Sequence, residues 1–416
     1  VERMKTRLIS LMKSVLLFLL SMIFLLPGCG KEEALGKWVK HKTSRTQEGW
    51  NYDMSIYKGS PPPEEDNFYM AEPFKGYLMN SSKGMEASYQ HPLVREKTEI
   101  FLERAHIAAK TRRQSGEAKI MNWRQLARNI RDASTSINDP EFNKAIKGND
   151  EEVMDHYFSS FNAFLMNLHK ATDRPRSYFP TIKKDVHLRT LLPHLSPMKK
   201  TVNFLRNASA FKLRKGDRQG AMKDIQSMFA LYRICKEDTW LISQLVRVAM
   251  GITIVDTYEE THAKGLWSTE ELIQWKAFFK NQGNGYGQLT RALQVERLSA
   301  LEVFELFLAD KPLFDQIATE QGSEGFAGIL NFKGMARDTV VEQMIAYDRL
   351  MQELITMVDP ENHQGHPNQT TVDFYFENQI PGPGKLSIAG TFIATHKTAL
   401  NAEKKLMEQF DSAYRK

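Results

Sequence analysis

Apolar residues recur at steps of three and four from about Leu93 to the C-terminus, and this period constrains the fold most. It is the spacing of one face of an α-helix. With 42% hydrophobic residues among 416, the chain can bury a sizeable core. We therefore predict an all-α domain over residues 93–416, built as an irregular stack of antiparallel helical hairpins. The expected helices cover residues 93–110, 123–133, 151–170, 199–215, 218–236, 239–264, 269–280, 288–309, 336–358 and 388–414.

The expected helix at 239–264 is apolar on nearly every side, with Leu241, Val248 and Val255 on one stripe. A helix of this kind is expected to lie inside the protein core. Gln244 and Arg247 interrupt the apolar run, so we do not expect this helix to span a membrane.

Turns between the expected helices carry helix-capping residues. An N-cap side chain accepts hydrogen bonds from free backbone amides, and a glycine often ends the preceding helix. Short connections of this kind favour antiparallel neighbours. The glycine-rich stretch at 281–287 and the Pro-Gly stretch at 381–384 are the two clearest breaks in the helical pattern. They either separate subdomains, with a possible boundary near 281–287, or kink a continuous helical stack. The capping pairs are Gly216-Asp217, Ser268 with Glu271, and Asn149 with Glu152.

One pair of expected helices carries small residues on both sides of a Gly-Asp turn. The residues are Ala208, Ala210, Leu213, Gly216-Asp217, Ala221 and Leu231. This stretch resembles a tetratricopeptide (TPR) hairpin, although no steady 34-residue period runs through the chain. Residues 205–260 also resemble a class of uncharacterised, membrane-anchored helical proteins of planctomycete-type bacteria. That resemblance implies a pair of long helices and no known activity.

The N-terminus has the composition of an export signal. Basic residues precede an uncharged apolar run at 14–26, which is followed by Pro27, Gly28 and Cys29. The run is shorter than the roughly 20 residues that a spanning helix needs. The sequence therefore predicts a signal peptide over residues 1–28.

The end of this run resembles the lipobox of bacterial lipoproteins, with Leu26 and Gly28 before Cys29. The resemblance implies cleavage before Cys29 and a lipid on its thiol, which would attach the protein to a membrane of the cell envelope. The alternative is an ordinary signal peptide cut near Gly28. In a Gram-negative cell, Gly30 rather than Asp after the lipidated residue favours the periplasmic leaflet of the outer membrane.

Cleavage would also change the charge and the thiol content. Residues 1–28 hold four basic residues and one acidic residue, so the mature chain would have 52 against 49 and a net charge of +3 instead of +6. An exported protein with this charge is not expected to bind nucleic acid. With Cys29 acylated, Cys235 is a single thiol that cannot form an internal disulfide, and its apolar surroundings predict a buried, inert side chain.

Residues 29–92 are polar and contain the proline-rich stretch at 59–66. Prolines of this kind impose an extended, semi-rigid segment. Nine large aromatic residues in this segment argue against full disorder. We therefore predict a lipidated tether that is partly ordered.

No constellation in the sequence points to a catalytic or cofactor site. Two Glu-x-x-His pairs, Glu103 with His106 and Glu259 with His262, have the spacing found in helical di-iron proteins. A basic stretch at 199–218 could face anionic lipid, or simply solvent. We expect a lipid-anchored helical scaffold that binds a protein partner in the envelope. The alternative is a helical envelope enzyme or metal-binding protein that uses Glu259 and His262.

Overall fold

A computed structural model of the chain describes residues 31–57, 60–75, 123–134, 147–179, 192, 194–282, 286–309, 312, 337–358 and 388–415. These residues form eleven α-helices and two short 3-10 helices, with no β-strand among them. The all-α prediction is confirmed for this part of the chain. The predicted helix at 93–110 lies outside the described residues.

The helix bounds follow the predicted ones closely, with one split. The helix expected at 151–170 is two helices, because the hydroxyls of Ser159 and Ser160 bond to backbone carbonyls at the break. The helices are α2 (Lys31–Gln47), α7 (Trp123–Ser134), α9 (Asp150–Ser159), α10 (Asn162–Thr172), α11 (Leu195–Arg214), α12 (Arg218–Lys236), α13 (Leu241–Ala263), α14 (Thr269–Asn281), α15 (Tyr286–Ala309), α18 (Arg337–Val358) and α20 (Ile388–Arg415), with 3-10 helices η1 (Met54–Tyr57) and η2 (Phe68–Met70).

The predicted caps are present. Ser268 accepts from the Glu271 amide while the Glu271 carboxylate accepts from the Ser268 amide, which is a full capping box. The Asn149 side chain accepts from two amides at the start of α9. Gly216 takes a left-handed backbone angle of 82° after α11, and Asp217 then caps α12.

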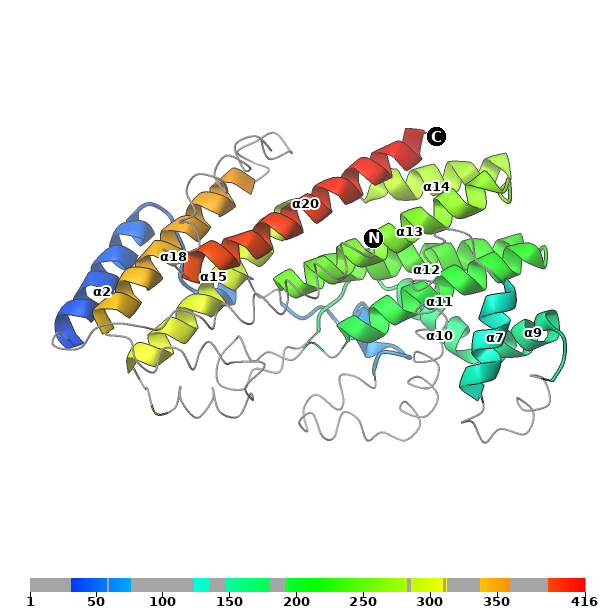
Figure 1. Cartoon of the computed structure of the whole chain (residues 1–416), viewed down its shortest axis with the longest axis horizontal. Helices are drawn as coiled ribbons and strands as arrows, with labels where there is room; N and C mark the ends of the chain where they lie inside the picture. The colour runs from blue at the N-terminus through cyan, green and yellow to red at the C-terminus, as the bar shows by residue number, and fades with distance from the viewer. Residues whose placement is uncertain are drawn as a thin grey trace.

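Two hydrophobic cores lie along the elongated molecule (Figure 1). The larger core is formed by η2, α7 and α9 to α14. The smaller core is formed by α2, α15 and α18 at the other end. Along the chain, α14 belongs to the larger core and α15 to the smaller one.

Helices α13 and α20 join the two cores. Leu241 and Leu245, at the start of α13, pack in the smaller core, and the buried apolar residues of that helix from Val248 onward belong to the larger one. Likewise α20 contributes Leu400 to the smaller core and Leu406 and Phe410 to the larger. It runs lengthwise between the two ends (Figure 1). Of the described helices, α13 alone is long and apolar enough to cross a membrane, and it is mostly buried inside the protein.

The hairpin predicted around Gly216-Asp217 is formed by α11 and α12, which pack against each other. Ala208 and Ala221 are buried, and their small side chains allow the helices to approach closely. The predicted pair of helices is therefore present.

The expected tether contains an element that we did not predict, the 17-residue helix α2. It packs against α18, with Trp38 and His41 buried. The buried positions are three and four residues apart, but they hold an aromatic ring, an imidazole and the half-buried Arg45 instead of aliphatic side chains. An apolar periodicity cannot detect a helix whose inner face is polar.

Candidate functional site

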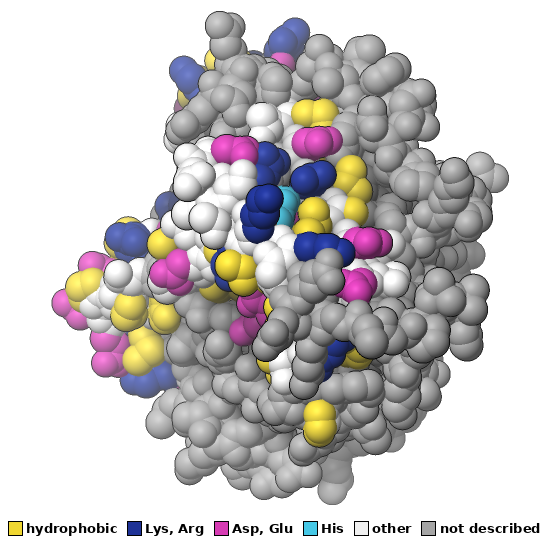
Figure 2. Space-filling view, turned by 90° about the vertical axis from the view of Figure 1, so that its left-hand side faces the viewer, with side chains coloured by type: hydrophobic (Ala, Val, Ile, Leu, Met, Phe, Trp, Pro, Cys, Tyr) yellow, Lys and Arg dark blue, Asp and Glu magenta, His cyan; other side chains and the backbone are white. Residues whose placement is uncertain are grey.

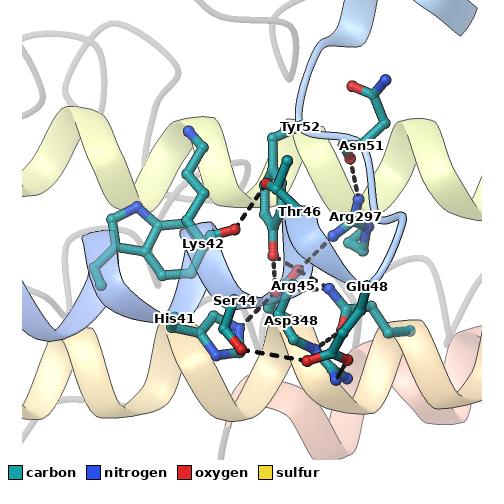
Figure 3. Close-up of polar contacts among 12 residues, drawn as sticks. His41, Lys42, Ser44, Arg45, Thr46, Glu48, Asn51, Tyr52, Arg297 and Asp348 are labelled. Atoms are coloured by element: carbon teal, nitrogen blue, oxygen red, sulfur yellow. Dashed lines mark hydrogen bonds and ion pairs between the residues drawn. The ribbon is translucent and has the colours of Figure 1, made fainter.

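The most concentrated set of buried polar groups in the described residues surrounds Asp348 of α18. This side chain is completely buried. Its carboxylate accepts from His41 Nε2 at 2.8 Å, from the Tyr52 hydroxyl at 2.6 Å, and from Gln352 Nε2 at 2.9 Å. Its other oxygen accepts from Arg297 Nη1 at 2.6 Å. Figure 3 shows that these groups come from α2, the segment after it, α15 and α18.

Arg297 of α15 is the matching buried cation. Its guanidinium also donates to the backbone carbonyl of Asn51 at 2.5 Å. It lies over the rings of Trp50 and Tyr52, with 5.3 and 4.9 Å to the ring centroids. One buried arginine therefore holds α18 on one side and the segment after α2 on the other. We call Arg297, Asp348, His41, Tyr52 and Gln352 the buried clamp.

Further contacts fix α2 at the edges of the buried clamp. Arg45 donates to Gln352 Oε1 at 2.5 Å. Trp38 Nε1 and Lys42 Nζ both donate to Glu305 of α15, at 2.9 and 3.1 Å. These bonds secure α2 along most of its described length.

The charges and protonation states in the buried clamp are suited to holding α2 against α15 and α18. Burial and the neighbouring Asp348 carboxylate raise the pKa of Tyr52 well above its usual value, so its hydroxyl stays a donor at neutral pH. The Asp348 charge is compensated by Arg297, and its oxygens are occupied by donors from the protein itself. A small surface hollow of about 160 Å³ lies beside this arrangement, lined by Lys42, Tyr52, Met54, Leu298, Leu301, Glu302 and Glu305.

A second buried ion pair joins the two helices that cross between the cores. Arg247 of α13 donates to Glu403 of α20 and to the Tyr232 hydroxyl of α12, and its Nε donates to Gln244 at 2.8 Å. Burial alone lowers the pKa of Arg247, but the Tyr232 and Glu403 oxygens outweigh it and the pKa is raised. The two polar residues that interrupt the apolar run of α13 are therefore its links to α12 and α20.

The predicted metal-binding pair does not gain a third ligand among the described residues. Glu259 and His262 are both half-buried near the end of α13, and the His262 ring lies 5.2 Å from the Tyr258 ring. No group of three or more His, Cys, Asp or Glu side chains that could hold a metal ion occurs in the described part of the chain. Glu103 and His106 lie outside it.

The basic stretch at 199–218 is largely paired with acidic side chains of neighbouring helices. Lys212 bonds to the buried Asp224, and Arg206 bonds to Glu260 at 2.8 Å. Near the turn, Lys215 contacts Glu151 and Asp155, and Arg218 contacts Glu271. Much of the positive charge of this stretch is therefore neutralised by carboxylates of neighbouring helices within the protein.

The structure describes one of the two cysteines, Cys235. Cys235 is buried in α12, and burial raises the pKa of its thiol well above the usual value, as an inert cysteine requires. Cys29, the predicted lipidation site, lies outside the described residues.

The buried clamp was missed by sequence reasoning. Its members are spread over residues 41 to 352, and no local motif links them. The one local signal is the three- and four-residue spacing of Trp38, His41 and Arg45, whose side chains do not form an apolar stripe.

Comparison with protein-family models, curated proteins and solved structures gave no match to this chain.

Proposed function

We propose that this protein is a lipid-anchored component of the bacterial cell envelope, whose helical body acts as a scaffold for another envelope protein. The observation that carries the proposal is the position of α2. Only Gly30 separates Cys29, the proposed lipid attachment site, from the first residue of α2. The buried clamp then fastens α2 to α15 and α18.

With α2 docked in this way, the lipid attachment site would have a fixed position relative to the helical body. A flexible tether lets a domain move away from its anchor, whereas a docked helix keeps the domain at the membrane in a defined orientation. Burial of Asp348 and Arg297 costs desolvation free energy, which is offset by their bond to each other and by the bonds from α2 and the segment after it.

The scaffold part of the proposal rests on the helical architecture. Packed helix pairs such as α11 with α12 present extended surfaces, which bind partners without catalytic groups. The TPR-like pattern of that hairpin supports the same proposal.

Intact mass and detergent partitioning, on wild type and Cys29→Ser produced in a bacterial host, test the anchor. We expect the wild type to start at Cys29, to carry acyl mass and to enter the detergent phase, and the variant to do none of these. Identical, water-soluble behaviour of both proteins would refute the anchor.

Cross-linking in envelope membranes tests the scaffold. A photoreactive residue at the exposed Met166 of α10 or Ile273 of α14 should give a discrete adduct with one envelope protein. Capture of nothing beyond lipoprotein-processing factors from both positions would contradict the scaffold role.

Metal analysis after loading with iron, manganese or zinc tests the alternative function, a metal-binding protein. Stoichiometric metal in the wild type that is lost in Glu259→Gln and His262→Gln would favour this alternative.

A further inference from the structure

The outer face of α2 carries exposed apolar side chains that the fold does not use. Leu35 and Val39 are one helical turn apart and are 37% and 59% exposed. Residues four apart lie on the same side of a helix. They are two of only six large hydrophobic side chains exposed among the described residues.

One exposed lysine accompanies this apolar pair. Lys40 follows Val39 on the exposed side of α2, whereas Lys37 lies 3.8 Å from the Asp338 carboxylate and Lys42 donates to Glu305. Figure 2 looks at the end of the molecule where α2 lies, and shows Lys and Arg side chains there together with Asp, Glu and hydrophobic side chains. Long cationic side chains can cover apolar surface while their charges reach phosphate groups.

The opposite side of α2 is fixed, so its outer face has one orientation relative to the body. Trp38 and His41 point into the protein, where His41 bonds to Asp348 and Trp38 to Glu305. With its inner side fixed to the body, α2 presents Leu35, Val39 and Lys40 outward in one orientation.

From these observations we propose that α2 lies on the surface of an anionic bilayer, with Leu35 and Val39 in the headgroup region and Lys40 at a lipid phosphate. The inference rests on the proposed lipid anchor, and it specifies that the anchor brings the outer face of α2 to the membrane. Two residue steps span at most about 7 Å, so an acyl chain on Cys29 would place the first turn of α2 at the headgroups.

Collision accessibility of a nitroxide label tests this placement. The label is attached to Val39→Cys in the full-length protein, with Ile273→Cys on α14 as the matched control, since Ile273 is similarly exposed at 61%. The buried thiol of Cys235 is not expected to react. Both proteins are reconstituted in vesicles of phosphatidylethanolamine and phosphatidylglycerol.

We expect the label at 39 to meet a water-soluble nickel complex about threefold less often than the label at 273, and to meet oxygen more often. Replacing phosphatidylglycerol by phosphatidylcholine should reduce this difference. Equal accessibility at both positions would overturn the inference, and so would spin–spin broadening at 39, which would assign the face to a second copy of the chain.

The intact mass of each sample separates the two proposals. Acylated protein with a water-exposed label at 39 retains the anchor and refutes the membrane-lying helix. Protein without acyl mass refutes the anchor. Because a free Cys29 thiol would also take the label, the Val39→Cys label is then measured in a Cys29→Ser background, where shielding by anionic vesicles supports the inference and exposure to water overturns it.

Discussion

At the scale of single residues, Gly251 sets how closely three helices approach. A Cβ at this position of α13 would lie 2.6 and 2.8 Å from the two methyl carbons of Leu406 in α20, and 3.0 Å from the Tyr232 ring in α12. Leu406 is fully buried, so it cannot swing into solvent. Gly251→Ala is expected to lower the free energy of unfolding by about 1–3 kcal/mol.

Gly36→Ala is the matched control for that substitution. Gly36 is in α2, and nothing lies within 4 Å of its added Cβ. Alanine favours a helix over glycine by about 0.5–1 kcal/mol, so this variant should be slightly more stable. Urea unfolding of both variants measures the contrast, and a similar effect at the two positions would contradict the close approach at Gly251.

Glu296 of α15 links stability to pH. Burial raises the pKa of its carboxyl to about 7, above the ordinary value for glutamate. Between the two values the folded protein binds the proton more strongly than the unfolded chain, so the free energy of unfolding falls as pH rises toward and through 7. The wild type should lose about 1–3 kcal/mol more than Glu296→Gln between about pH 5 and pH 8. Denaturant unfolding at the two pH values measures this, and parallel losses would show that Glu296 titrates normally.

At the scale of elements, the Arg247–Glu403 pair tests how α20 is held against α13. Both side chains are buried, at 0% and 1% exposure. Glu403→Ala would leave a buried guanidinium without its carboxylate and is expected to cost about 3–5 kcal/mol. The double substitution Arg247→Met with Glu403→Leu should recover most of this loss, because no buried charge then remains.

An exposed pair on the same helix is the control for that experiment. Arg415 bonds to Asp411 at 2.8 Å one turn away, with side chains 77% and 64% exposed. Asp411→Ala should change stability by less than about 0.5 kcal/mol. Thermal unfolding of the three variants is the measurement. If the double variant is as unstable as Glu403→Ala, the loss reflects packing and not an unpaired charge.

Elements with an aliphatic inner face could be predicted from the sequence. The α12 bounds, 218 and 236, match the prediction at both ends, because Asp217 caps the start and Ala221, Ile225 and Met228 form a regular apolar face. Helix α2 could not be predicted in the same way. Its buried face is Trp38, His41 and Arg45, and these residues become a packing surface only when Asp348 and Gln352 are brought to them.

At the scale of the whole molecule, the connections between cores depend on residues far apart in the chain. His41 and Asp348 are 307 positions apart, and Arg247 and Glu403 are 156 apart. Local patterns carry no information on such pairs. The sequence therefore predicted an all-α body with helix caps, but neither the buried clamp nor the role of α20 in joining the two cores.

Helix α2 is packed as part of the helical body and does not act as a flexible tether. Hydrogen exchange of backbone amides tests this packing directly, on wild type and on Asp348→Asn, which keeps the side-chain shape and removes the charge. In the wild type we expect amides at 38–47 to exchange as slowly as those of α18, and in the variant we expect α2 to exchange faster while α11 and α12 stay unchanged. If α2 exchanges at the rate of an unfolded chain in the wild type while α18 remains protected, the segment is a flexible tether and is not part of the helical body.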